Sequence, residues 1–410
     1  MTRADLRALG AVLLLALGLR LYGVWHPPQR FIDEVPNMEG AVQYAERGHF
    51  EPDTWQHPPL RHLVGYAFLS ALGDDPWGWR LKNVLLGAAT AALAWAFALH
   101  ATGNRRAALL AGLLVATDPL HVVLSRFTAE EIYGGALFLA GVVLWQARRD
   151  RTWGLVGAAA LLGCALAIKW YWLLAWLLLL LILLAEDGRW RDLRTAAFVG
   201  CVWTLVPLTI YVASYLPWFG RGYGLAELPE HVANALAFQQ WMTGEYVHAT
   251  DGRATLQGHL SALEWFVRPI AVGWSVRPEQ DTVELDLYAN SLPVWILTLP
   301  AVIALAVHAI RQRRVEPALP VALFLALWLP LVVTRRPVFL YSASVVLPFA
   351  FTAVGWGIAR VSERLGARLY WGALAALLAW NLYLYPLVTM RRVPEAAYRP
   401  VLPWVHVESP

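Results

Sequence analysis

Long apolar runs alternate with short polar segments along the whole chain. A helix needs about 17–25 apolar residues to cross roughly 30 Å of hydrocarbon. The runs therefore predict a membrane protein that crosses the bilayer many times through helices. The eleven predicted spans are Leu6–Trp25, Trp79–His100, Ala107–Leu124, Ile132–Gln146, Trp153–Ile168, Trp170–Ala185, Ala196–Leu216, Leu292–Ile310, Ala318–Val333, Val338–Ile358 and Leu369–Thr389.

The first run follows Arg3 and Arg7 and resembles a signal peptide. It has no clean small-residue cleavage site, and Arg20 interrupts its apolar sequence. Both features argue against removal of the segment. We therefore expect a retained helix.

One apolar segment, His62–Gly73, is too short to be a span. Its twelve residues would cover about 18 Å as a helix. If this segment lies in the membrane interface, all arginine clusters fall on one side, which the positive-inside rule makes cytoplasmic. If it spanned, every cluster after the first would face outward. The clusters are Arg3/Arg7, Arg105/Arg106, Arg148/Arg149/Arg151, Arg189/Arg191/Arg194, Arg311/Arg313/Arg314 and Arg360/Arg364/Arg368.

This orientation predicts the amino terminus inside and the carboxy terminus, after Thr389, outside. The fold class expected is an all-α polytopic membrane protein with a single domain over residues 1–410. Two external loops, residues 26–78 and 217–291, would carry short interfacial helices. Residues 292–390 would form a carboxy-terminal region of four helices.

Composition agrees with a membrane protein. Hydrophobic residues make up 58% of the 410 residues and charged residues 15%, against about 45–50% and about 25% in soluble domains. These values exclude disorder and a coiled coil. The net charge of +4 is too small for a nucleic-acid-binding protein. The only two cysteines, Cys164 and Cys201, lie inside apolar runs, so no disulfide framework is expected.

The first external loop carries two candidate catalytic groups, Asp33 and Glu34. Adjacent carboxylates can simply be part of a solvated loop. Near a dry interface, however, one of them can act as a general base, because its pKa can be raised toward the working pH. The same loop continues to His57-Pro58-Pro59-Leu60. The two prolines fix an extended corner, so His57 either has a chemical role or only marks that corner.

Two further external positions carry cations. Arg126 and Glu131 lie where two predicted helices reach the outer surface, either as an ion pair or as a phosphate-binding arginine with its orienting carboxylate. Lys169 lies between two apolar runs. An ionisable residue at this depth is a candidate functional residue, although a lysine that reaches the interface beside aromatic residues is an equal alternative.

Arg268 in the second loop and Arg335 and Arg336 at a later tip also face outward in this topology. They can bind an anionic partner or, without specificity, anionic lipid headgroups. Together with Arg20, these cations and the carboxylates gather on one external face. That convergence predicts a membrane-embedded enzyme that handles a lipid phosphate from the external leaflet. No metal-binding motif is present, so no metal site is expected.

The motifs resemble those of the protein O-mannosyltransferases, a family of GT-C membrane glycosyltransferases. Arg20 precedes Asp33 by thirteen residues as an arginine does in that family, and Glu131 follows Ser-Arg as an acidic residue does. The matching motifs, in chain order, are Phe31-x-Asp33-Glu34-Val35, His57-Pro58-Pro59-Leu60, Arg80-Leu81, Asp118-Pro119-Leu120-His121, Ser125-Arg126, Lys169-Trp170, Arg268-Pro269, Asn290-x-x-Pro293-x-Trp295 and Arg336-x-x-Phe339-Leu340.

The resemblance implies an inverting transfer of a sugar from a polyprenyl-phosphate donor, with mannose as the expected sugar. Asp33, with Glu34, would activate the acceptor hydroxyl. Arg126, Lys169, Arg268 and Arg336 would bind the donor phosphate, with Arg20, His57 and Glu131 in support. No cofactor is implied besides this donor substrate.

The partners expected are the lipid-linked donor, membrane lipids and an acceptor, with the active site facing outside a bacterial plasma membrane. The acceptor would be a Ser or Thr of a secreted protein. A glycolipid or a cell-wall polymer, as for aminoarabinose transferases, is the alternative acceptor. A secondary transporter is the alternative from another class, but it would place charges at mid-membrane in two matching halves.

Overall fold

The computed structural model describes residues 2–30, 34–49, 57–185, 192–249, 261–279, 281–334 and 338–407. Most of these residues are helical, as the sequence predicts. The chain forms two compact units. Unit 1 comprises Met1–Pro27, Gly87–Arg126 and Tyr246–Pro410, and unit 2 comprises Pro28–Leu86 and Phe127–Glu245.

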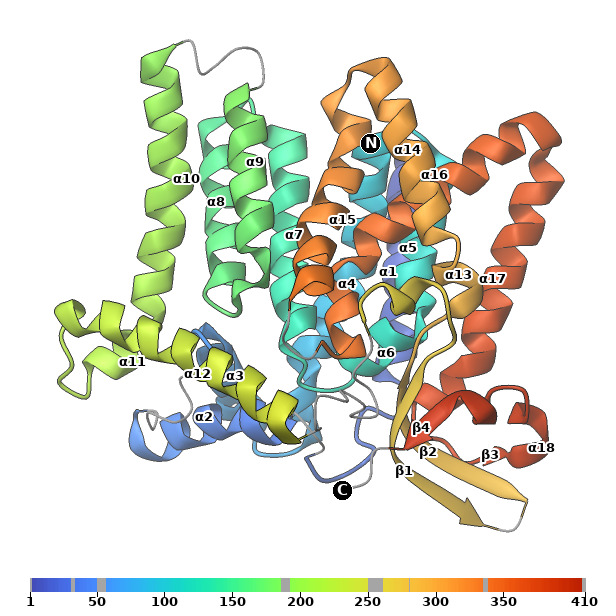
Figure 1. Ribbon diagram of the computed structural model, residues 1–410, viewed down its shortest axis with the longest axis horizontal. Helices are drawn as coiled ribbons and strands as arrows, with labels where there is room; N and C mark the ends of the chain where they lie inside the picture. The colour runs from blue at the N-terminus through green and yellow to red at the C-terminus, as the bar shows by residue number, and fades with distance from the viewer. Residues whose placement is uncertain are drawn as a thin grey trace. The chain divides into compact units, whose positions relative to one another are not determined.

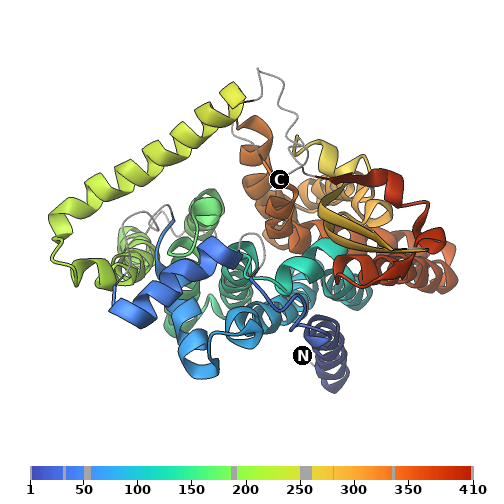
Figure 2. The ribbon, with the colours of Figure 1, turned by 90° about the horizontal axis from the view of Figure 1, so that it is seen from below.

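Unit 2 contains a row of four helices with further helices across one end (Figures 1 and 2). The row consists of α7 (Glu130–Arg148), α8 (Thr152–Leu166), α9 (Leu173–Ala185) and α10 (Leu193–Ser214). The elements at the end are α2 (Glu34–Arg47), α3 (Leu60–Leu72), the start of α4 (Pro76–Thr102), the 3-10 helices η2 (Trp170–Trp172) and η4 (Leu225–Glu227), α11 (Leu216–Phe219) and most of α12 (Leu228–Ala249).

Small residues allow the helices of unit 2 to approach one another closely. A Cβ on Gly163 of α8 would lie 2.7 Å from the Cα of Pro207 on α10. On the other side of α8, a Cβ on Gly141 of α7 would lie 3.1 Å from the Ala158 carbonyl oxygen. Small residues at such contacts are typical of membrane helices, which associate mainly through close packing.

Unit 1 combines helices with a small sheet. Its helices are α1 (Arg3–Leu21), the rest of α4, α5 (Arg105–Thr117), α6 (Pro119–Ser125), η5 (Glu264–Phe266), α13 (Leu292–Trp295), α14 (Thr298–Gln312), α15 (Val315–Val333), η6 (Leu340–Val345), α16 (Leu347–Leu365), α17 (Ala367–Val388), α18 (Glu395–Tyr398) and η7 (Leu402–Trp404). Its strands are β1 (Ala271–Glu279), β2 (Thr282–Ala289), β3 (Val393–Pro394) and β4 (Val405–Val407), in the order β3-β2-β1-β4.

The sheet is a finding that the sequence analysis did not anticipate. β1 and β2 form an antiparallel hairpin with Ala271 opposite Ala289, and β4 adds to β1 in parallel. The alternation in Thr282–Ala289 is a strand signal of period two that could have revealed the hairpin. Residues 217–291 therefore hold a hairpin and the 22-residue helix α12, not only short helices.

The chain is an integral membrane protein, but the number of its spans is not confirmed. Within the described residues, five helices are long and apolar enough to cross a membrane, or six if α5 and α6 form one span bent by 56°. The five are α4, α10, residues 292–312 with α14, α15 and α17. α3, α8 and residues 170–185 are apolar but shorter. The count of eleven spans stays a prediction.

In unit 1, the helix ends that carry the predicted cytoplasmic arginines lie together. Arg105 Nε is 2.6 Å from Asp5 Oδ1, which joins the starts of α5 and α1. Asn104 donates to Glu363 at 3.2 Å, and the Tyr370 hydroxyl donates to the Arg106 carbonyl at 2.9 Å. The sheet lies at the opposite end of this unit (Figure 1). The clusters at the starts of α1 and α5 and around the turn between α16 and α17 thus lie together in unit 1, and the membrane side that they face stays a prediction.

We predict that α2 faces the outside and that the turn after α14 faces the cytoplasm. In a background without Cys164 and Cys201, Glu46→Cys should react with a membrane-impermeant maleimide in intact cells. Arg313→Cys should react only after permeabilisation. Both side chains are exposed, so access to the reagent depends on the membrane side alone. Equal labelling of both positions in intact cells would contradict the topology.

Candidate functional site

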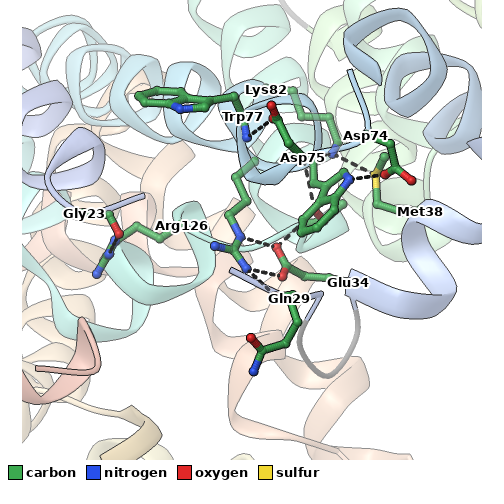
Figure 3. A network of polar contacts seen from close by, with 12 residues as sticks. Gly23, Gln29, Glu34, Met38, Asp74, Asp75, Trp77, Lys82 and Arg126 are labelled. Carbon is green, nitrogen blue, oxygen red and sulfur yellow. Dashed lines mark hydrogen bonds and ion pairs between the residues drawn. The ribbon is translucent and has the colours of Figure 1, made fainter. Parts of the chain in front are cut away.

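A buried ion pair holds the start of α2 in unit 2. Arg80 of α4 donates to Glu34 through Nε at 2.9 Å and through Nη2 at 2.8 Å. Both side chains are fully buried. Arg80 also donates to the Gln29 carbonyl at 3.0 Å (Figure 3). This two-pronged geometry is the strong form of a charge-assisted hydrogen bond, and it fixes the residue that follows Asp33 in the sequence.

A second cluster joins four buried charges of unit 2. Lys169 Nζ lies 2.6 Å from Glu131 Oε1 and 3.5 Å from Glu130 Oε2. Arg61 of α3 pairs with Glu130, the first residue of α7. The Lys169 ammonium also lies 4.8 Å from the centroid of the Tyr171 ring. Two cations and two carboxylates thus compensate one another where α3, α7 and η2 meet.

The His57-Pro58-Pro59-Leu60 motif positions α3 in this cluster. Pro59 is the residue before α3, and the Leu60 N–H donates to the Ala167 carbonyl at 3.2 Å. His57 is half-buried and interacts electrostatically with Glu130. The corner that the two prolines predict therefore places Arg61, the second residue of α3, beside Glu130.

In unit 1, Arg20 stabilises the bend between α5 and α6. Its Nη1 donates to the Ala116 carbonyl at 2.9 Å and its Nη2 to the Val115 carbonyl at 3.0 Å. These carbonyls belong to the last turn of α5, where helix carbonyls need external donors. Arg20 is fully buried, and its Nη2 also lies 2.9 Å from His121 Nδ1 of α6.

The other side of the bend depends on Asp118, which accepts from the His121 N–H at 2.9 Å and caps α6. Trp295 of α13 donates to its other oxygen at 2.8 Å. α6 ends at Ser125, directly before Arg126. Arg126 is 4% exposed, and its Nη2 donates to the Gly23 carbonyl at 2.7 Å. Arg20 and Asp118 thus determine where Arg126 lies within unit 1.

Arg268 has a different environment. Its side chain is 48% exposed and pairs with Glu264 at 3.4 Å. Its carbonyl accepts from Asn290 Nδ2 at 2.9 Å, and the same amide nitrogen donates to the Trp265 carbonyl. The Arg-Pro and Asn motifs of the sequence are therefore joined through the backbone in this turn.

Two of the predicted site residues, Asp33 and Arg336, lie outside the described residues, as does Arg335. The described residues hold no group of three or more His, Cys, Asp or Glu side chains that could bind a metal ion.

An apolar cavity of about 450 Å³ lies between α9, α10 and α12 in unit 2. Trp170, Trp176, Tyr211 and Leu236 are among its lining residues. Trp170 directly follows Lys169, and its indole N–H donates to the Tyr211 hydroxyl at 3.3 Å. Apolar walls of this kind suit an apolar ligand.

Comparison with known proteins locates the chain among membrane glycosyltransferases. Residues 70–220 match the sequence profile described as "Dolichyl-phosphate-mannose-protein mannosyltransferase". The polyprenol-phosphate-mannose–protein mannosyltransferase of Mycobacterium tuberculosis is 22% identical, over 78% of this chain and 76% of that protein.

Residues 70–220 are a domain of this mannosyltransferase family. The chain is a membrane glycosyltransferase. Two solved structures have the same GT-C fold. The Saccharomyces cerevisiae Pmt1-Pmt2 complex bound to the sugar donor has a TM-score of 0.65 and 12% identity, over 95% of this chain and 91% of that one. ArnT from Cupriavidus metallidurans, bound to undecaprenyl phosphate, has a TM-score of 0.55 and 16% identity, over 92% of this chain and 62% of that one.

The sequence analysis of this glycosyltransferase missed three paired residues, Arg61, Arg80 and Glu130. Arg80 was noted only as part of a motif, and Arg61 was not noted at all. The sequence does contain a signal for them, because each is a charged residue beside an apolar segment. Such residues are rarely buried without a partner of opposite charge. The sequence could not give the partner of each, since the pairs join residues 46 and 69 positions apart.

We predict that Glu34→Gln strongly destabilises the enzyme. Removal of one partner from a buried ion pair costs about 3–5 kcal/mol, because the other charge stays buried. The melting temperature of the purified protein should fall clearly, and Glu34→Leu with Arg80→Met should recover part of the loss. The matched control is Glu363→Gln, which removes a half-exposed pair with Arg360 and should cost about 0–1 kcal/mol. A Glu34→Gln melting temperature equal to that of the wild type would show that the pair does not stabilise the fold.

Proposed function

We propose that this glycosyltransferase moves mannose from a polyprenyl-phosphate donor to a hydroxyl of a secreted protein, with inversion, at the external face of the membrane. The observation that carries the proposal is the fully buried Glu34–Arg80 pair at the start of α2. A membrane enzyme needs a fixed base for the acceptor hydroxyl, and this pair anchors the residue next to the Asp33 carboxylate. The names of the sequence relatives support the donor and the acceptor class.

Asp33 is the proposed base, and Glu34 its anchor. Glu34 has both carboxylate oxygens engaged by Arg80, which suits it to hold the start of α2 rather than to contact the acceptor. Asp33 directly precedes this anchored residue in the sequence. In the reaction, the acceptor O–H would lose its proton to Asp33 while its oxygen attacks the anomeric carbon. The bond from that carbon to the phosphate oxygen breaks, and the lipid phosphate leaves.

The leaving phosphate needs cations instead of a proton donor. Arg126 is the proposed phosphate ligand that the structure describes best, because it is buried, directly follows α6 and donates from Nη2 to the Gly23 carbonyl. Arg336, Arg268 and Lys169 are the other candidates from the sequence. Lys169 is committed to Glu131 and Glu130, which favours a positioning role for it. The apolar cavity beside Trp170 suits a polyprenyl chain.

The test supplies labelled polyprenyl-phosphate mannose to the purified full chain in lipid vesicles. One arm contains a threonine-containing peptide and another a lipid A-type glycolipid. We expect label on the peptide, with an anomeric configuration opposite to that of the donor. Label only on the glycolipid would overturn the protein acceptor but retain the donor chemistry. Absence of transfer in both arms, with bound donor, would overturn the proposed function.

We predict that Asp33→Asn lowers the transfer rate by about 10²–10⁴-fold, as expected for loss of a general base. The variant should keep the wild-type melting temperature, because the anchoring pair uses Glu34. Glu39→Gln, which changes an exposed acid of α2, is the control and should keep its activity. Activity of Asp33→Asn within a few fold of wild type would rule Asp33 out as the base.

We predict that Arg126→Lys raises the donor KM and leaves the acceptor KM nearly unchanged. Lysine keeps the charge but loses the planar fork that grips phosphate at two points. Arg336→Lys should behave in the same way if Arg336 also binds the donor, whereas Lys169→Met should mainly lower the melting temperature. Arg360→Lys, on an exposed helix end, is the control. Unchanged donor dependence in Arg126→Lys, Arg336→Lys and Lys169→Met would assign these cations a structural role.

A further inference from the structure

Three arginines gather at one end of unit 1, around the segments that follow α1, α6 and α17. Arg20 and Arg126 have been described above. The third is Arg391, whose guanidinium carbon lies 4.9 Å from the centroid of the Tyr22 ring. Tyr385 of α17 interacts electrostatically with all three, and its hydroxyl donates to the Leu19 carbonyl at 2.6 Å.

Gly23 makes room for two of these guanidinium groups. Its φ of +67° lies in the left-handed region that favours glycine. A Cβ at this position would lie 1.9 Å from Arg391 Nη2 and 3.5 Å from Arg126 Nη2. The terminal nitrogens of Arg391 and Arg126 therefore approach the same point, where any larger residue would displace Arg391.

The positive charge of Arg391 has no carboxylate partner among the described residues. Among the same residues, its buried Nε makes no hydrogen bond. Glu284, the acid that pairs with the neighbouring Arg392 at 3.7 Å, also lies 3.8 Å from His26. Charges interact more strongly where they are shielded from water, so an anion beside the Arg391 guanidinium would be favoured.

We propose that Arg391 is a second guanidinium ligand, together with Arg126, for the phosphate of the lipid-linked donor. This inference rests on the proposed function and deepens it by naming a further residue of the phosphate site. The donor phosphate is a diester with one negative charge. Once the sugar has left, the lipid phosphate is a monoester with a charge of about −1.5 to −2 at neutral pH. Two guanidinium groups match this gain of charge.

A ligand that binds developing charge accelerates the reaction, because it stabilises the transition state more than the bound donor. Arg391→Gln should therefore lower kcat more than it raises the donor KM. A residue that only supports the fold near Tyr22 would not discriminate between the singly and the doubly charged phosphate. Comparing the affinities for the singly and the doubly charged phosphate therefore distinguishes a phosphate ligand from a residue that only stabilises the fold.

The experiment measures binding by calorimetry to the purified full chain in detergent. The probes are farnesyl phosphate, which mimics the product, its methyl diester, which mimics the donor, and farnesol. Arg391→Gln should weaken farnesyl phosphate binding about 10–100-fold, as expected for loss of a hydrogen-bonded charge. The diester should lose less, and farnesol should bind unchanged. Arg391→Lys, the variant that best preserves the fold, should fall between wild type and Arg391→Gln.

Arg392→Gln is the matched control, since the neighbouring arginine pairs with Glu284 instead. It should keep farnesyl phosphate affinity within about threefold, because the Arg392 side chain is 42% exposed and its ion pair with Glu284 is therefore weak. Equal loss in Arg392→Gln and Arg391→Gln would show a general field effect and overturn the assignment, as would unchanged affinity in Arg391→Gln. Competition by inorganic phosphate as strong as that of farnesyl phosphate would assign the site to free phosphate and overturn the lipid ligand.

The outcome can be separated from that of the proposed function. If wild type transfers no mannose but Arg391→Gln still loses farnesyl phosphate, the lipid-phosphate site stands and the transfer reaction fails. If wild type transfers mannose and Arg391→Gln retains both farnesyl phosphate affinity and kcat, the reaction stands and the role of Arg391 fails.

Discussion

A charge that is buried away from water needs a partner, and this requirement organises the end of unit 2 where the candidate chemistry lies. The cost of an unpaired buried charge is several kcal/mol. Arg80 and Glu34 compensate each other as a single fully buried pair. Arg61, Lys169, Glu130 and Glu131 compensate one another as a group of four. Because these pairs join α2, α3, α4, α7 and η2, they also determine where those elements pack.

Unit 1 meets a related requirement by hydrogen bonds to backbone. The bend of 56° between α5 and α6 exposes helix carbonyls in an apolar setting. Arg20 donates to two of them, and Asp118 caps the helix that follows. The same arginine that holds the bend also belongs to the group of cations near Tyr385. A structural arginine thus contributes positive charge to the region in which Arg126 lies.

The candidate functional groups lie at helix ends and in the segments that follow them. Glu34, Glu130 and Lys169 stand at or beside the first residue of a helical segment, and Arg126 and Arg391 follow the last. Helix ends are anchored by the body of a helix but leave side chains clear of the apolar span. This placement explains how a protein with few charged residues, 15% of the chain, can assemble several charged groups.

The sequence by itself determined the helical membrane class, the arginine-rich helix ends and the motifs of the family, because each depends on local composition or spacing. It could not determine that Glu34 pairs with Arg80, that Lys169 is shared between Glu130 and Glu131, or that Arg391 approaches Arg126 beside Gly23. These contacts join residues far apart in the chain. The hairpin β1–β2 and its pairing with β4 were missed for the same reason. Only the tertiary structure brings such partners together, since it alone decides which buried charge faces which.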